Sequence, residues 1–163
     1  MDVLWQELTA GLANSGQLER VLLRVVTATV LRAIVGFERE KAGKPAGFRT
    51  HILVCLGTAI VVLSCAGSGM TMDGLSRVIQ GIVTGIGFIG AGSILKLSEQ
   101  RDIQGLTTAA GLWMTAAIGV ACGLGTIGLA LIAAVMTLIV LGVLRAMEAR
   151  ATALTEKVRK RGN

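Results

Sequence analysis

Five apolar stretches alternate with polar segments along the chain, and this pattern sets the predicted architecture. The stretches cover residues 18–37, 51–66, 77–96, 105–123 and 127–144. About 20 predominantly apolar residues are enough for a helix to cross a bilayer. We therefore predict an all-α fold, a polytopic membrane bundle of about five transmembrane helices within residues 18–144.

The two ends of the chain are more polar than this predicted transmembrane domain. In residues 1–17, leucines recur every four positions beside Trp5, which predicts a short interfacial helix, with a loose terminus as the alternative. Residues 145–163 are basic and carry one apolar seam at helical spacing. This tail is predicted to be a helix that continues the fifth span, lies on anionic lipid or pairs with a second copy.

The third apolar stretch is rich in glycine. A glycine inside a helix costs roughly 1 kcal/mol relative to alanine, so its repeated use calls for a reason. Spacing of the GxxxG type lets a second membrane helix approach closely. We predict that the other helices gather around this one and that its glycines serve helix packing, namely Gly81, Gly85, Gly87, Gly90 and Gly92. An opened helix is the alternative. The pattern GxGxxG within residues 85–90 lacks the strand and the acidic residue that a dinucleotide site requires.

The first apolar stretch contains arginines. Arg20, Arg24 and Arg32 are four and eight residues apart, which places them near one face of a helix. No Asp or Glu lies between residues 20 and 37 to pair with them. Two interpretations stay open: Arg24 and Arg32 extend to the two membrane surfaces, or they face a polar cavity or an anionic partner.

The positive charges predict the orientation. Twelve of the 16 Lys and Arg residues lie after the first stretch, at or after the end of the third stretch (Lys96 and Arg101) or in the tail, whereas residues 67–76 contain none. Lys and Arg accumulate in cytoplasmic loops. We predict a multi-pass membrane protein with an external N-terminus and a cytoplasmic C-terminus. His51, at the start of the second stretch, is expected to be a polar anchor at the membrane surface.

Composition narrows the function. A hydrophobic fraction of 53% and 22 glycines indicate a membrane protein, and the distribution of the net charge of +6 argues against nucleic acid. The three cysteines lack the spacing of a zinc site, so no metal or cofactor is predicted. No nucleophile–base arrangement is evident, and no catalytic residue or enzymatic activity is predicted.

Four segments resemble the membrane domain of the MgtC/SapB family: GFERE at 36–40, KPAGFRTHILVCLG at 44–57, RVIQGIVTGIGFIGAGSI at 77–94 and GLTTAAGLWMTAAIG at 105–119. The resemblance implies a bacterial inner-membrane protein associated with low magnesium and survival in host cells. Longer members carry a soluble C-terminal domain, where we expect at most a basic helix here. The charged positions that match the family pattern are Glu38, Arg39, Glu40, Arg49, Asp73 and Arg77.

Two functions remain after this comparison of motifs. The first is regulation of another membrane protein through helix contacts, in a lipid environment and with a second copy as a further candidate partner. The second is an ion transporter or channel subunit, with magnesium as one candidate ion. Carboxylates are the usual protein ligands of magnesium, and within the predicted spans there is only Glu19, at the edge of the first one.

Overall fold

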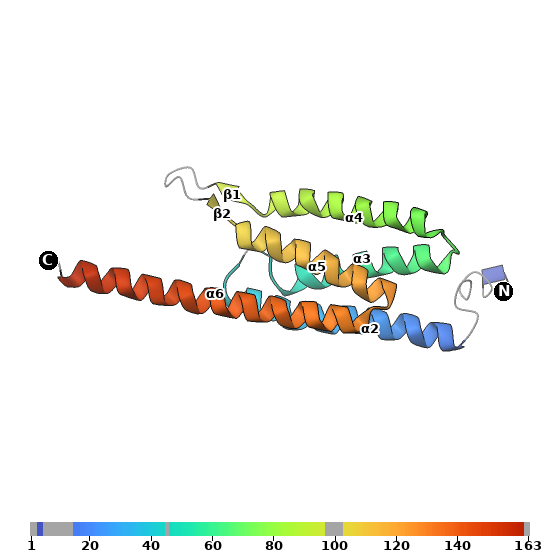
Figure 1. Cartoon of the computed structure of the whole chain (residues 1–163), viewed down its shortest axis with the longest axis horizontal. Coiled ribbons are helices and arrows are strands. Elements are labelled where there is room, and N and C mark those ends of the chain that lie inside the picture. The colour runs from blue at the N-terminus through green and yellow to red at the C-terminus, as the bar shows by residue number, and fades with distance from the viewer. Residues whose placement is uncertain (1–2, 5–14, 45, 97–102, 162–163) are drawn as a thin grey trace.

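The computed structural model describes residues 3–4, 15–44, 46–96 and 103–161 of the 163-residue chain, with side chains as far as Met147. Five long helices lie side by side (Figure 1). They are α2 (Ser15–Lys41), α3 (Phe48–Gly67), α4 (Met72–Gly92), α5 (Leu106–Leu124) and α6 (Ile127–Arg161). Two-residue strands, β1 (Leu95–Lys96) and β2 (Ile103–Gln104), pair antiparallel between α4 and α5. The predicted all-α fold class is confirmed.

Short turns connect successive helices and fix their antiparallel order. Gly125 ends α5 with a φ of 83°, a left-handed conformation that glycine adopts without strain, and α6 begins at Ile127. Thr71 caps α4, because its side chain accepts a hydrogen bond from the Gly74 amide. The loops are shorter than predicted, since residues 38–41 and 72–76 are helical.

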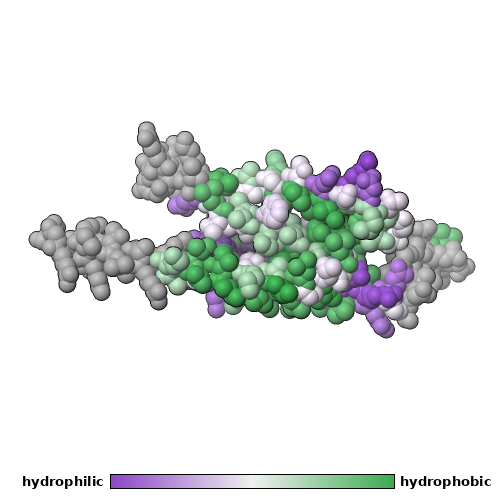
Figure 2. Space-filling view, viewed as in Figure 1, coloured by the Kyte–Doolittle hydropathy of each residue, from purple (hydrophilic) through white to green (hydrophobic). Residues whose placement is uncertain are grey.

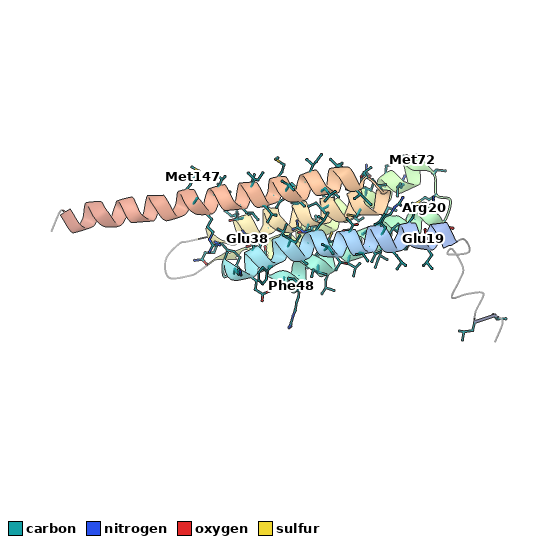
Figure 3. The ribbon with its side chains drawn as sticks, turned by 90° about the horizontal axis from the view of Figure 1, so that it is seen from below. Glu19, Arg20, Glu38, Phe48, Met72 and Met147 are labelled. Atoms are coloured by element: carbon teal, nitrogen blue, oxygen red, sulfur yellow. The ribbon has the colours of Figure 1, made fainter. Side chains whose placement is uncertain are left out.

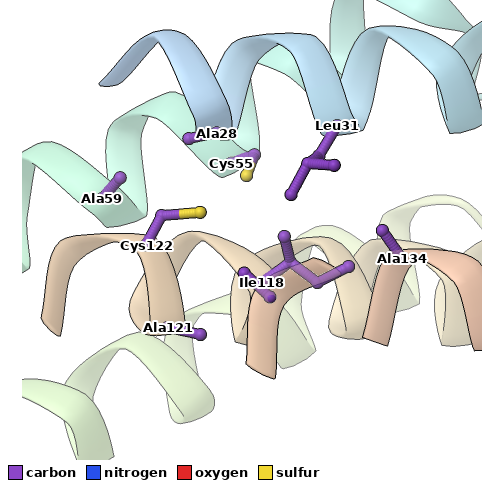
Figure 4. Close-up of a cluster of buried hydrophobic side chains, with 9 residues drawn as sticks. Ala28, Leu31, Cys55, Ala59, Ile118, Ala121, Cys122 and Ala134 are labelled. Atoms are coloured by element: carbon purple, nitrogen blue, oxygen red, sulfur yellow. The ribbon is translucent and has the colours of Figure 1, made fainter. Parts of the chain in front are cut away.

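The central helix is α5. Of its most apolar 18 residues, 56% are buried inside the bundle, against 22% for α3 and 17% for α4 and for α6. Small side chains from four helices meet around it in the core (Figure 4). That cluster consists of Ala28, Leu31, Cys55, Ala59, Ile118, Ala121, Cys122, Ala130 and Ala134. The prediction that the other helices surround the glycine-rich third span is therefore wrong.

The glycines of α4 lie mostly on an uncovered surface. A Cβ atom added at Gly81, Gly85, Gly87 or Gly92 would meet nothing within 4 Å. At Gly90 it would lie 3.6 Å from the Ala109 side chain, an ordinary contact with α5. Against the residues that the structure describes, Gly90 alone among the five has the predicted packing role. A role of the other four toward a second molecule stays a prediction.

The glycines that do permit close packing are on α5. Gly111, Thr115, Gly119 and Gly123 recur every four residues and are buried. A Cβ at Gly119 would overlap the Thr58 hydroxyl and lie 2.5 Å from the Cys55 carbonyl oxygen of α3. The close approach of α3 and α5 therefore requires glycine there, as in other membrane helix pairs with small residues at the contact.

Four helices are long and apolar enough to cross a membrane, namely α3, α4, α5 and residues 127–147 of α6. α2 is the fifth long helix and contains more charges. Its polarity is nevertheless that of a membrane helix, because Val26, Val30 and Ile34 are exposed while Arg32 is fully buried. Figure 2 shows apolar residues over the middle of the bundle and hydrophilic residues mainly toward its ends.

Of the two predicted terminal segments, the structure describes the C-terminal one almost completely and the N-terminal one only in part. Residues 5–14 of the predicted interfacial helix lie outside the described residues. The backbone of α6 runs without a break from Ile127 to Arg161 and extends beyond the other helices (Figure 1). The backbone of the tail thus continues the helix of the fifth span, while contact with anionic lipid and pairing with a second copy stay predictions.

Candidate functional site

Three arginines of α2 lie along α5 and form the main polar feature of the interior. Arg24, Arg32 and Arg39 are eight and seven residues apart, about two helical turns in each case. Arg24 Nη1 donates to the Gly123 carbonyl oxygen at 3.0 Å, and Arg39 Nη2 donates to the Thr108 hydroxyl at 3.3 Å. Arg32 lies between these two arginines on α2 and also donates to groups of α5. We name Arg24, Arg32 and Arg39 the arginine ladder.

The middle of the ladder is a buried polar cluster. Arg32 Nη2 contacts the Thr115 hydroxyl, lies 2.9 Å from His51 Nδ1 and 3.5 Å from the Gly111 carbonyl oxygen. Thr115 Oγ1 also lies 2.7 Å from His51 Nδ1 and 2.7 Å from the Gly111 oxygen. A guanidinium only donates, so a neutral His51 with Nδ1 as the acceptor satisfies this arrangement.

Uncharged groups alone hold the positive charge of Arg32. Arg32, His51 and Thr115 each have an exposed fraction of 0%. Within the part of the chain that the structure describes, Arg32 Nε, Arg32 Nη1 and His51 Nε2 have no hydrogen-bond partner. The sequence contains no Asp or Glu between residues 20 and 37, 41 and 72, or 103 and 147. The interior beside the ladder is therefore electropositive.

This arrangement decides between the two interpretations of the intramembrane arginines. Arg32 faces the interior, and Arg24, which is half-buried, reaches the turn between α5 and α6. A buried charge without a charged partner is unusual in a membrane helix, where ionisable residues are by default candidates for function. The alternative in which Arg32 extends to the membrane surface is excluded.

The structure divides the six charged residues that match the family pattern. Four lie at the end of the bundle where α2 ends and α3 begins, namely Glu38, Arg39, Glu40 and Arg49. Asp73 and Arg77 form an exposed ion pair of 3.2 Å at the start of α4. The 20 residues of α3 separate the two groups by about 30 Å (Figure 3). The six residues therefore do not form one cluster.

Two further contacts lie at the end of the bundle where α2 ends and α3 begins, which we name the basic end. Glu38 Oε1 lies 3.7 Å from Arg145 Nη1 of α6. Glu40 Oε2 accepts a hydrogen bond of 3.0 Å from the amide of Phe48, the first residue of α3. Glu40 therefore satisfies a helix terminus, and Arg49 is an exposed residue of the next turn.

Sequence reasoning missed the role of three residues in this site. His51 is fully buried and hydrogen-bonded, so its predicted role as a polar anchor at the membrane surface is wrong. Thr108 and Thr115 are seven residues apart on α5, which matches the separation of Arg39 and Arg32 on α2. That shared spacing was the available signal, because residues seven apart lie on one face of a helix.

The metal-binding capacity of the site is small. No group of three or more His, Cys, Asp or Glu side chains is close enough to hold a metal ion among the described residues. The polar groups that meet in the interior are two cationic side chains, an imidazole and hydroxyls. They can bind an anion or a carbonyl oxygen more readily than a divalent cation.

Comparison with known proteins identifies the family. The family model described as MgtC family matches residues 25–150. The chain belongs to the MgtC family. This match includes most of the site, namely Arg32, Arg39, His51, Thr108 and Thr115, whereas Arg24 lies one residue before it.

Individual relatives agree with this family assignment. "Putative magnesium transporter YhiD" of Escherichia coli is 43% identical over 129 residues, covering 75% of this chain and 59% of that protein. "Protein SrpB" of Synechococcus elongatus is 40% identical, covering 72% and 71%. "Protein MgtC" of Salmonella typhimurium is 42% identical, covering 72% and 49%. The chain thus spans about half to three fifths of YhiD and MgtC. No solved structure matches this MgtC-family chain.

Proposed function

We propose that this MgtC-family chain is an inner-membrane regulator of another membrane protein, acting in adaptation to low magnesium or host-cell stress. One observation carries the proposal: the charged side chains buried in the described part of the bundle are cationic, with Arg32 and Arg39 at 0% and 3% exposure. A protein that conducts magnesium needs the opposite charge along its path.

Electrostatics and coordination chemistry both argue against a path for magnesium along the ladder. Two unit charges 4 Å apart interact by about 4 kcal/mol at an effective dielectric constant of 20, and the charge of a divalent ion doubles that repulsion. Magnesium also requires near-octahedral oxygen ligands and gives up its water reluctantly. The ladder offers two carbonyl oxygens and two hydroxyls, and these already accept hydrogen bonds from arginine.

The uncovered face of α4 supports action through contact. Gly81 and Gly85 are exposed and have open space in front of them. A groove of about 530 Å³ runs between α3 and α4, with Gly57 and Gly85 among its lining residues. Small residues on an exposed membrane helix allow another helix to pack closely. The partner would be another membrane protein or a second copy of this chain.

Transport is the second candidate function. The name of one relative, "Putative magnesium transporter YhiD", favours it, and so does the open groove between α3 and α4. A transporter of this kind would have to move the ion along α4, where backbone carbonyls of an opened helix would supply oxygen ligands.

A flux assay separates the two functions. The purified chain, placed in sealed vesicles that contain a magnesium indicator, should give no entry of Mg²⁺ above that of empty vesicles. Saturable entry in the native chain that changes in Arg32→Met would contradict the proposal and support transport. In cells, Gly85→Leu should lose regulation while remaining folded and inserted, because the substitution alters only the uncovered face.

A further inference from the structure

A polar pocket of about 180 Å³ lies at the basic end of the bundle, between α2 and α6. Its charged lining residues are Glu38, Arg39, Lys44 and Arg145. Three of these side chains are cationic and one is acidic, so the pocket attracts an anion. The volume is sufficient for several water molecules or for a group of phosphate size.

An apolar pocket of about 280 Å³ adjoins it between α5 and α6. Thr107, Leu141 and Leu144 line both pockets, so the two hollows lie side by side and share a wall. Along α6 the apolar pocket extends from Leu144 back to Met136, a distance of about 12 Å along the helix. That stretch lies within the apolar span of α6, residues 127–147.

We propose that this double pocket binds an anionic glycerophospholipid of the phosphatidylglycerol type. The phosphate would lie against Arg39, Lys44 and Arg145, and an acyl chain would enter the apolar pocket. Basic pockets between membrane helices are a recognised way to bind anionic headgroups. The proposal goes beyond the regulatory function and is independent of whether the chain regulates or transports.

Glu38 explains why the headgroup should carry a hydrogen-bond donor. Its Oε1 lies 3.7 Å from Arg145 Nη1, whereas its Oε2 is buried and has no partner among the described residues. A buried acceptor without a partner is unfavourable unless a ligand or water satisfies it. The glycerol hydroxyls of phosphatidylglycerol can donate to it while the phosphate neutralises the cations.

Binding to the delipidated full chain in neutral detergent tests the proposal by native mass spectrometry. The wild-type chain should retain phosphatidylglycerol in preference to phosphatidylcholine. Lys44→Gln and Arg145→Gln remove exposed cations, and each should weaken phosphatidylglycerol binding about fivefold. Arg77→Gln, at the far end of the bundle, is the matched control and should bind as the wild type does.

A second pair of variants tests the acyl-chain pocket. Ala110 is an exposed residue that lines the apolar pocket, so Ala110→Phe should fill it and weaken lipid binding without disturbing the core. Ala66→Phe, at an exposed position near the end of α3, should have no effect. Thermal unfolding of each variant verifies that it is folded.

Three results would overturn the proposal. One is equal binding of phosphatidylglycerol and phosphatidylcholine, and another is unchanged binding in the Lys44 and Arg145 variants. The third is displacement of the lipid by inorganic phosphate at equal concentration, which would show that the site recognises a free anion and has no use for the acyl chain.

Discussion

At the scale of single residues, the position of Arg32 depends on uncharged acceptors. Thr115 has a central place, because its hydroxyl contacts Arg32, His51 and the Gly111 carbonyl at once. Leaving a buried donor without its acceptor costs about 1–3 kcal/mol, and more for a charged group. Thr115→Val should therefore lower the free energy of unfolding by about that amount.

Thermal unfolding in detergent measures this effect. Thr84→Val on α4 is the control, because the Thr84 hydroxyl is exposed and bonds only to the Gln80 carbonyl of its own helix. Equal midpoints of thermal unfolding for Thr115→Val and Thr84→Val would show that the Thr115 hydroxyl does not stabilise the buried position of Arg32.

The ladder also shows what the sequence reveals about single residues. The spacing of Arg24 and Arg32 placed them on one face of a helix. It did not show whether that face was exposed to lipid or buried in the bundle. The acceptors escaped prediction for a physical reason: threonine hydroxyls and glycine carbonyls occur in most membrane helices and carry no charge pattern. Only their position opposite the arginines distinguishes Thr108 and Thr115.

At the scale of helices, the number of glycines in a span does not tell which of its faces is covered. α4 has five glycines in the stretch singled out by sequence, yet only Gly90 contacts a neighbour, whereas Gly119 and Gly123 of α5 meet α3 directly. The positions of the helices along the chain were predictable, because the length of each apolar stretch determines them. Which helices pack against one another was not predictable, since small residues suit contacts within the chain and between chains equally well.

This difference gives a prediction for two single-methyl additions. Gly119→Ala should destabilise or unfold the chain, because the new Cβ would overlap Thr58 and approach the Cys55 carbonyl oxygen. Overpacking of this kind typically costs about 1–3 kcal/mol, and rigid backbone makes it larger. Gly85→Ala should leave folding intact or improve it, since alanine favours helix by about 1 kcal/mol over glycine.

The amount of folded chain that elutes as one species in size-exclusion chromatography distinguishes the two variants, and thermal unfolding quantifies them. Equal behaviour of Gly119→Ala and the wild type would contradict the close α3–α5 contact. Loss of folding in Gly85→Ala would show that α4 packs against a further molecule at Gly85, such as a second copy of the chain.

At the scale of the whole molecule, the status of α2 decides the topology. Length and composition qualify four helices as membrane spans, and α2 is not among them. In the middle of α2, however, the charged side chain Arg32 lies inside, covered by α3 and α5, while Val26, Val30 and Ile34 are exposed and apolar. The exposed charged side chains of α2 lie at its two ends, namely Glu19, Arg20, Glu40 and Lys41. A helix with that distribution is suited to lipid, because apolar side chains face outward and the buried arginine donates to acceptors within the protein.

We therefore predict that α2 crosses the membrane, so that the chain has five spans and its two ends lie on opposite sides. A reporter at the N-terminus should read external, and one fused after Arg159 should read cytoplasmic, since Lys and Arg collect on the cytoplasmic side. A further reporter between Gly67 and Met72, in the turn between α3 and α4, should read external. If α2 lay on the membrane surface, four spans would remain and both ends would read cytoplasmic. The N-terminal reporter alone thus separates the two topologies, and the fusion after Arg159 verifies in the same experiment that the bundle is inserted in the expected direction.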